Sequence, residues 1–78
     1  MDTIDFEIRG DYITLDALLK ATGVAESGGA AKAMVADGRV QVDGRDELRK
    51  TCKLRARQVV AVTGVRIRLS AAGEGGAG

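Results

Sequence analysis

Apolar and polar side chains alternate near the start of the chain, over residues 3–9. Ile4, Phe6 and Ile8 fall on one side of this segment, and charged or hydroxyl-bearing side chains fall on the other. A period of two residues is typical of a β-strand with one buried face. We therefore predict a half-buried strand that ends at the turn-forming pair Gly10-Asp11.

The spacing of apolar residues becomes helical after residue 14. Leu15, Leu18 and Leu19 recur at i, i+3 and i+4, and Thr14 stands where a helix N-cap is expected. Gly23 can end the helix in a left-handed conformation. The pattern predicts a helix of about two turns.

A second short helix is predicted to begin after Ser27, a good N-cap residue, and to stop at Gly38. Ala31, Met34 and Val35 would form its inward face. Helices this short are marginal in isolation, so both must pack against each other or on a sheet.

The second half of the chain has the pattern of strands joined by tight turns. Val40 and Val42 run into Asp43-Gly44, a dipeptide typical of two-residue hairpins, and a returning segment follows through Leu48. Two more strands are predicted over residues 59–62 and 65–69, separated by a turn at residues 63–64.

This order of elements predicts an α+β fold, with two short helices packed on a small, mostly antiparallel, curved sheet and an N-terminal strand. The 78 residues allow one small domain, which we place at residues 1–70. Residues 71–78 are glycine, alanine and one glutamate, and we expect them to form a disordered tail.

Charge is distributed unevenly although the net charge is only +1. Residues 1–26 hold six acidic and two basic side chains, a net charge of −4, whereas residues 27–70 hold ten basic and four acidic ones, a net charge of +6. A solvated surface mixes its signs more evenly, so this polarity favours a polyanionic partner for the second half.

Composition excludes several classes of function. With one cysteine and no histidine, the chain has no internal disulfide and no Cys/His metal set, and no nucleophile lies beside a base. We expect no enzymatic activity, no metal and no cofactor. The N-terminus lacks the features of a signal peptide and no segment approaches about 20 apolar residues, so we expect a cytoplasmic protein without a membrane partner.

Three motifs together resemble a known family: Thr-Leu-Asp-Ala-Leu-Leu at residues 14–19 with Gly23, Ser-Gly-Gly-Ala-Ala-Lys-Ala-Met-Val at residues 27–35, and Gly-Arg-Val-Gln-Val-Asp-Gly at residues 38–44. They are similar to the RNA-binding domain first defined in bacterial ribosomal protein S-four, and in particular to its small stand-alone, YbcJ-like members. The resemblance covers about residues 14–63.

The resemblance implies the alpha-L fold, in which two helices and a small sheet form an L-shaped surface that lies against structured RNA. Relatives use this surface on ribosomal RNA and transfer RNA. Arg49-Lys50 and Lys53 match the stand-alone subgroup. The chain departs from the family at Gly28, because many relatives have an arginine directly after the capping serine.

The strongest candidate for RNA contact is a cluster of basic residues after the hairpin. Arginine makes forked contacts to phosphate oxygens, and both arginine and lysine release counterions on binding. The alternative is that the cluster forms an ordinary solvated face, and Arg55 and Arg57 can equally be charges at the edge of a strand. The cluster comprises Arg45, Arg49, Lys50, Lys53, Arg55 and Arg57.

The start of the second helix is the other candidate. Backbone N–H groups at Ser27 and Gly28 can hold a phosphate, although the serine can equally serve only as a cap. Lys32 lies at the edge of this helix and can pair with a phosphate. Arg39 is a secondary candidate, as are Arg66 and Arg68, which face solvent from a strand. Cys52 sits among cations that can lower its pKa, but packing is the simpler role.

Aromatic residues make up only 3% of the chain, so it cannot stack several bases of a single strand. The leading hypothesis is a monomeric protein that binds structured RNA through phosphate and shape contacts, with ribosome association as one setting. The alternatives are a protein-interaction module that docks an acidic partner through the basic residues, and DNA binding, which phosphate contacts alone do not distinguish.

Overall fold

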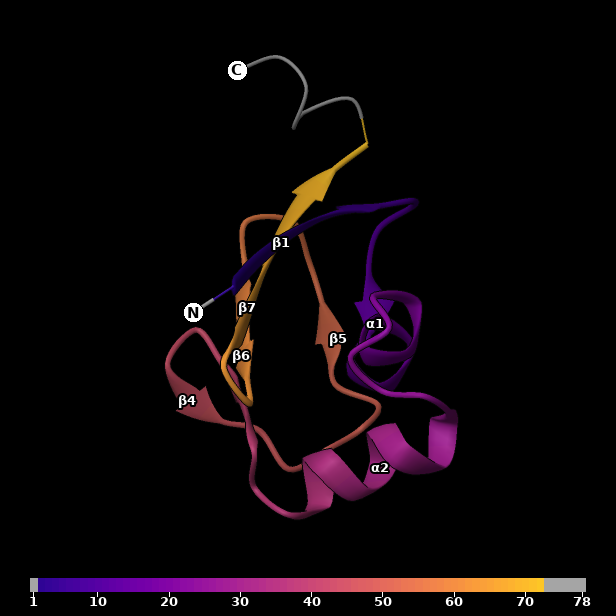
Figure 1. Cartoon of the computed structure of the whole chain (residues 1–78). Helices are drawn as coiled ribbons and strands as arrows, with labels where there is room; N and C mark the ends of the chain where they lie inside the picture. The colour runs from indigo at the N-terminus through magenta and orange to yellow at the C-terminus, as the bar shows by residue number, and fades with distance from the viewer. Residues whose placement is uncertain (1, 73–78) are drawn as a thin grey trace.

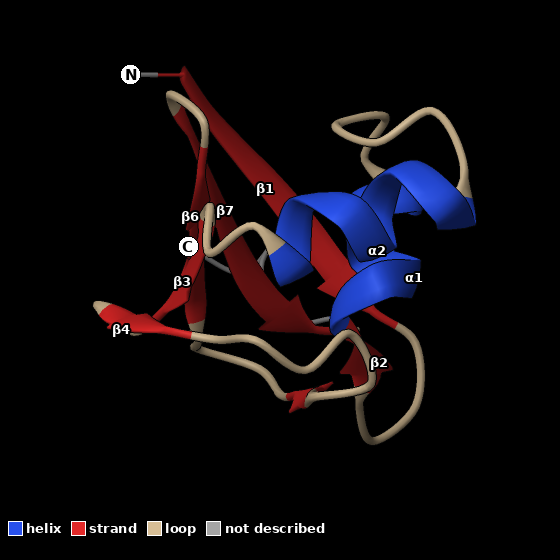
Figure 2. Cartoon of the chain, turned by 90° about the horizontal axis from the view of Figure 1, so that it is seen from below, coloured by secondary structure: helices blue, strands red, loops and turns tan. Residues whose placement is uncertain are grey.

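The computed structural model describes residues 2–72, and the residues 73–78 of the predicted tail lie outside the described residues. Two helices lie on one face of a five-stranded sheet, and two short strands form a second sheet (Figures 1 and 2). The predicted α+β arrangement is therefore confirmed. In chain order the elements are β1 (Asp2–Ile8), β2 (Ile13–Thr14), α1 (Leu15–Ala21), α2 (Gly28–Ala36), β3 (Val40–Val42), β4 (Arg45–Asp46), β5 (Lys53–Leu54), β6 (Val59–Val62) and β7 (Val65–Ala71).

The first and last strands of the main sheet are neighbours. The strand order is β1-β7-β6-β3-β4, and β1 runs parallel to β7 from Asp2 opposite Val65 to Ile8 opposite Ala71 (Figure 1). The other three pairs are antiparallel, so the sheet is mixed but mostly antiparallel, as predicted. Because β7 includes Ala71, the ordered sheet extends one residue beyond the boundary predicted at residue 70.

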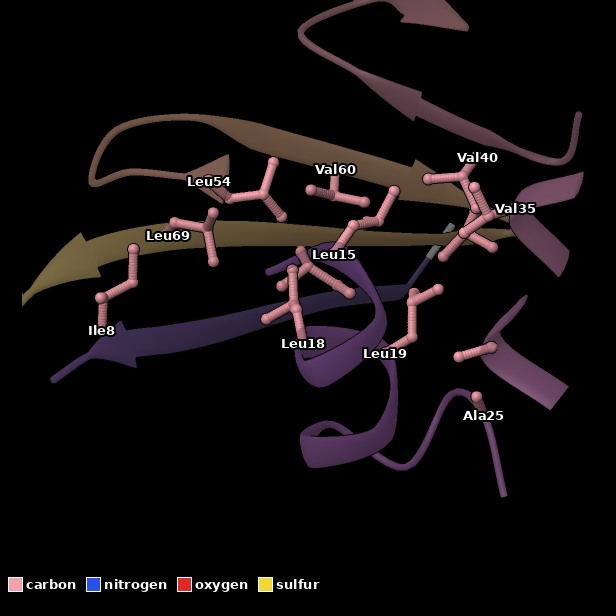
Figure 3. Packing of buried hydrophobic residues seen from close by; sticks show 13 residues of the cluster. Ile8, Leu15, Leu18, Leu19, Ala25, Val35, Val40, Leu54, Val60 and Leu69 are labelled. Atoms are coloured by element: carbon pink, nitrogen blue, oxygen red, sulfur yellow. The ribbon is translucent and has the colours of Figure 1, made fainter. Parts of the chain in front are cut away.

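One face of the main sheet and the two helices enclose the core. Alternate strand residues such as Ile8, Val60 and Ile67 point to the helices, as the period of two predicted. Leu18 and Leu19 of α1 enter the same cluster and are fully buried (Figure 3). The opposite face, which we call the outer face, carries polar and charged side chains and is not covered by a helix (Figure 2).

The helix ends follow the sequence with one exception. Ser27 caps α2 as predicted, since its Oγ accepts a hydrogen bond from the Ala30 N–H at 3.1 Å. Gly23 and Gly38 follow the two helices with φ of 79° and 74°. Thr14 occupies the N-cap position of α1 but makes no side-chain cap bond, so this part of the prediction was wrong.

The hairpin between β3 and β4 has the predicted turn. Asp43 and Gly44 have φ of 52° and 84°, the left-handed pair of a two-residue turn whose twist matches the strands. The returning strand β4 ends at Asp46, and one further backbone hydrogen bond, from the Glu47 N–H to the Val40 carbonyl at 3.0 Å, continues the pairing. Leu48, the predicted end of that segment, is 64% exposed.

Asp43 also fastens this hairpin to β6. Its two carboxylate oxygens accept hydrogen bonds from the Gln58 side chain and the Val59 N–H, each at 3.0 Å. These two bonds, the one from Gln58 first, hold the pKa of Asp43 below its ordinary value of 3.8. The ionised carboxylate therefore stabilises the folded state.

The core predicts a sharp contrast between two leucines. Leu18→Ala removes a fully buried side chain and is expected to lower the free energy of unfolding by about 2–5 kcal/mol. Leu48→Ala changes an exposed side chain and should shift it by about 0.5 kcal/mol or less. Urea denaturation followed by circular dichroism measures both, and equal losses would contradict the assigned core.

Asp43 predicts a pH-dependent contribution to stability. A carboxyl whose pKa is lowered by folding stabilises the protein above its unfolded pKa, and this contribution is lost as pH falls through the folded pKa. Asp43→Asn tolerates the left-handed backbone but lacks the charge. The variant should have a lower urea midpoint than the wild type at neutral pH, and the gap should close well below pH 3.8. A constant gap would contradict the assignment.

Candidate nucleic-acid interface

The basic residues after the hairpin lie on a loop that is fixed to the start of α1. We call residues 47–55 the basic loop. The Asp16 N–H donates to the Lys50 carbonyl and the Leu15 N–H donates to the Cys52 carbonyl, both at 2.9 Å. Further along, Leu54 pairs with Ile13 across the small β2-β5 sheet. The first N–H groups of a helix need external acceptors, and the loop carbonyls supply them in place of the Thr14 side chain.

The Asp16 carboxylate lies at the start of α1, next to the contact with the basic loop. The Thr14 hydroxyl instead makes a hydrogen bond with Asp16, which is the main reason that the pKa of Asp16 is lowered, and Lys50 contributes by its charge. Asp16 in turn accepts a hydrogen bond from the Ala17 N–H at 2.9 Å. The start of α1 therefore carries a carboxylate close to the loop, which partly offsets the positive charge there.

Glu47 orders the first part of the basic loop. One oxygen of its carboxylate accepts hydrogen bonds from the Arg49 backbone N–H at 3.0 Å and from the Arg49 Nε at 3.4 Å. The backbone bond is the largest cause of the lowered pKa of Glu47. The Arg49 side chain is still 79% exposed, so it can bind a ligand while it contacts Glu47.

Cys52 is a packing residue of the loop. It is half-buried against the core, and burial together with the hydrogen bond and charge of Glu47 raises the pKa of its thiol. The expectation that neighbouring cations lower this pKa was wrong, because the carboxylate and the burial outweigh the opposing effect of Arg49.

Two cations of the basic loop, Arg49 and Lys53, line a shallow hollow of about 250 Å³ together with Thr51 and Cys52. Lys50 is exposed on the same loop but does not line the hollow. The hollow thus joins two of the three residues that both the charge pattern and the family resemblance singled out. A hollow with cationic walls and a hydroxyl is suited to a phosphate group.

Lys53 and Arg55 flank Tyr12, a residue that the sequence pattern did not select. The Lys53 Nζ lies 5.0 Å and the Arg55 Cζ lies 6.0 Å from the centre of the Tyr12 ring. An aromatic residue next to a predicted turn was the available signal, but its cationic neighbours are about 40 residues away in sequence and become visible only in the fold.

The start of α2 is open to a ligand. A Cβ at Gly28 would meet no atom within 4 Å, and one at Gly29 would meet only the Ser27 Oγ at 3.8 Å. No acidic residue occupies the first turn, and Lys32 is exposed one turn further on. Backbone N–H groups can therefore approach an anion closely here.

The start of α2 and the basic loop are separated by the length of that helix. Leu48 of the loop lies 4.0 Å from the place that a Cβ would take at Gly38, just beyond the end of α2. The helix has nine residues and so rises about 13 Å. The start of α2 therefore lies about one helix length from Leu48, and Lys32 lies on α2 between these two points.

The remaining basic candidates lie elsewhere. Arg45 is exposed on β4 opposite Val42, so it points to the side of the sheet that carries the helices. Arg39 is exposed beyond α2, with its Nε 3.9 Å from Asp37. An exposed pair of this length contributes little and leaves the arginine accessible.

Arg57 belongs to the outer face rather than to the basic loop. Its backbone adopts a left-handed φ of 75°, and it lines a hollow together with Asp5, Glu7 and Arg68. Arg68 donates to Asp5 at 2.9 Å. Arg66 points to the same face, opposite Thr3. Acidic residues of β1 therefore surround the arginines on this side.

Within residues 2–72, no group of three or more histidine, cysteine, aspartate or glutamate side chains is arranged to hold a metal ion. In the same range, no helix is long and apolar enough to cross a membrane.

Comparisons with known proteins show the family of this chain. Residues 6–70 match the family model described as the S4 domain. Two curated relatives, from Escherichia coli (strain K12) and Shigella flexneri, are named "Putative RNA-binding protein YbcJ" and "Uncharacterized protein YbcJ". Each is 43% identical over 60 residues, which cover 77% of this chain and 86% of the relative.

A solved structure is similar as well. The solution structure of YbcJ from E. coli, described as revealing an alpha-L motif involved in RNA-binding, matches with a TM-score of 0.62 and 38% identity. The match covers 90% of this chain and 87% of that protein. On the family model and these relatives together, the chain belongs to the S4 domain family.

Proposed function

We propose that this protein binds structured RNA, such as ribosomal or transfer RNA, through its basic loop. The observation that carries the proposal is the exposure of Arg49, Lys50 and Lys53 on a loop whose backbone is fixed to α1 by two hydrogen bonds. The name of one YbcJ relative and the description of the solved YbcJ structure, which both refer to RNA binding, support it.

The loop favours recognition of the RNA backbone over base sequence. Its cations point to solvent, where lysine contacts a phosphate as a single charge and arginine contacts it through two N–H groups. Such contacts carry no information about base sequence. A-form RNA offers a wide minor groove and phosphate rows that proteins recognise by shape. The exposed start of α2, at Ser27 and Gly28, provides a second phosphate contact, and Lys32 lies between the two.

Further candidates extend the contact around this centre. Arg55 ends the loop and Arg45 precedes it, whereas Arg39 and Arg57 lie further out and contribute less. We infer a binding module rather than an enzyme, acting in the cytoplasm as a monomer without a cofactor, with the ribosome as one possible site of action. The one thiol, Cys52, makes a hydrogen bond with Glu47, but this contact and burial raise its pKa and so disfavour the reactive thiolate.

Salt dependence tests the proposal. With roughly five phosphates engaged, log K for a transfer RNA or a ribosomal RNA hairpin should fall against log salt with a slope of about −3 to −5. Filter binding measures it, with polyglutamate as an acidic competitor that lacks RNA shape. A flat response, or equal competition by polyglutamate and RNA, would contradict RNA recognition and favour an acidic protein partner.

Charge removal tests the assigned centre. Replacing Arg49, Lys50 and Lys53 together with glutamine should reduce the magnitude of the slope of log K against log salt by about 3. Lys32→Gln should reduce it by about 1 or less. The triple variant should therefore lose far more affinity. The charge-matched control replaces Lys20, Arg66 and Arg68, which lie outside the proposed contact, and should bind nearly as well as the wild type. The reverse ranking would move the site away from the basic loop.

A further inference from the structure

Tyr12 is the one exposed aromatic ring among the described residues. It precedes β2, and its side chain is 43% exposed, which is unusual for a large ring in a chain with two aromatic residues. In the β2-β5 pair, Ile13 and Leu54 point into the core, whereas Lys53 is exposed. The alternation of side chains places Tyr12 on the outward side, together with Lys53 and Arg55.

The ring and its two cations are already positioned in the free protein. The Lys53 Nζ and the Arg55 Cζ lie 5.0 Å and 6.0 Å from the ring centre, within the range of cation–π attraction. The Arg55 guanidinium donates to the Asp11 carbonyl at 3.3 Å, and its backbone N–H donates to the Gln58 side chain at 2.7 Å. A ligand would therefore find this group preorganised.

The ring also borders a hollow. Tyr12 and Phe6, the two aromatic residues of the chain, line a depression of about 330 Å³ together with Glu7, Arg9 and Ile13. Its volume lies at the lower end of small-ligand sites, which span about 300–1,000 Å³. Its walls are partly apolar and carry one cation, Arg9, and one carboxylate, Glu7, and the Tyr12 ring is shared between this hollow and the cations Lys53 and Arg55. This combination suits a flat apolar ring attached to an anion.

We propose that Tyr12, Lys53 and Arg55 form a stacking subsite for one unpaired base of the RNA that the basic loop holds. The base would stack on the Tyr12 ring, and its phosphate would contact Lys53 and Arg55. The inference rests on the proposed function, because Lys53 belongs to both sites. Phe6 is packed against the core, so the subsite accepts a single base and not an extended single strand.

The ligand is therefore a paired stem with one extruded nucleotide. A fully paired stem keeps all of its bases inside the helix and offers nothing to Tyr12, although its phosphates still reach the basic loop. A stem with one bulged nucleotide offers an unpaired base to Tyr12 and phosphates to the basic loop. We therefore expect the preference for bulged over fully paired RNA to depend on the Tyr12 side chain.

Two hairpins test the subsite: a short RNA hairpin with one unpaired adenosine in its stem, and the same hairpin without it. Stacking of one base on an aromatic ring is worth enough to make the bulged hairpin bind about fivefold tighter or more. Tyr12→Leu should abolish this preference and leave affinity for the paired hairpin unchanged. Tyr12→Phe keeps a ring and should retain the preference. A Leu variant that weakens both hairpins equally would make Tyr12 only a structural residue.

Fluorescence gives a readout that needs no variant. The chain has one tyrosine and no tryptophan, so its intrinsic emission reports on Tyr12 alone. The bulged hairpin should quench this emission more than the paired hairpin at equal saturation, and unchanged emission would overturn the subsite. Equal binding of both hairpins would overturn the subsite but not RNA binding. Binding of neither hairpin would overturn the proposed function as well.

Discussion

The packing of Leu15, Leu18 and Leu19 against the inner face of the main sheet determines where the candidate interface lies. These side chains are fully buried, so α1 has one position and one orientation. Its first N–H groups then bind carbonyls of Lys50 and Cys52, which fixes the basic loop. The apolar core thus positions charged side chains that never enter it. A loop held in this way loses little conformational entropy on binding, so more of each phosphate contact appears as affinity.

The distribution of charge gives the molecule two unlike sides. Three of the six acidic residues near the N-terminus lie on β1, where Asp5 pairs with Arg68 on the outer face. The basic loop instead carries four cations and one acidic residue, Glu47. A polyanion is therefore attracted to the loop, whereas the carboxylates of β1 offset the charge of the arginines on the outer face. The net charge of +1 conceals the uneven distribution, because the negative charge of residues 1–26 offsets most of the positive charge of residues 27–70.

Local patterns predicted most of the fold. The period of two in β1, the helical spacing of the leucines and the Asp43-Gly44 turn are interactions among near neighbours, and the structure contains each of them. The parallel pairing of β1 with β7 joins segments about 60 residues apart, and no local signal specifies it. The two-residue strands β2 and β5 are too short for any periodicity.

The candidate site was predictable in its charges but not in its geometry. Composition and resemblance selected Arg49, Lys50 and Lys53, and the structure places them on one loop. The same signal also included Arg57, which lies beside acidic residues on the outer face because the chain turns sharply there. Sequence spacing cannot reveal such a turn at a non-glycine residue, where a left-handed φ is uncommon. Tyr12 was not predicted as a site residue, because its cationic neighbours approach it only through the β2-β5 pairing.

Glu47 shows how the loop balances order against charge. Its carboxylate repels phosphate, and a loop selected for attraction alone would not contain it. It nevertheless holds the Arg49 backbone and side chain, and its lowered pKa reflects these hydrogen bonds. An ordered arginine that remains mostly exposed can meet a phosphate at once, whereas a mobile one must first be immobilised. The Glu47 carboxylate thus weakens the long-range attraction of the loop for phosphate but orders Arg49 for contact. This favours recognition of a defined RNA shape over indiscriminate binding to any polyanion.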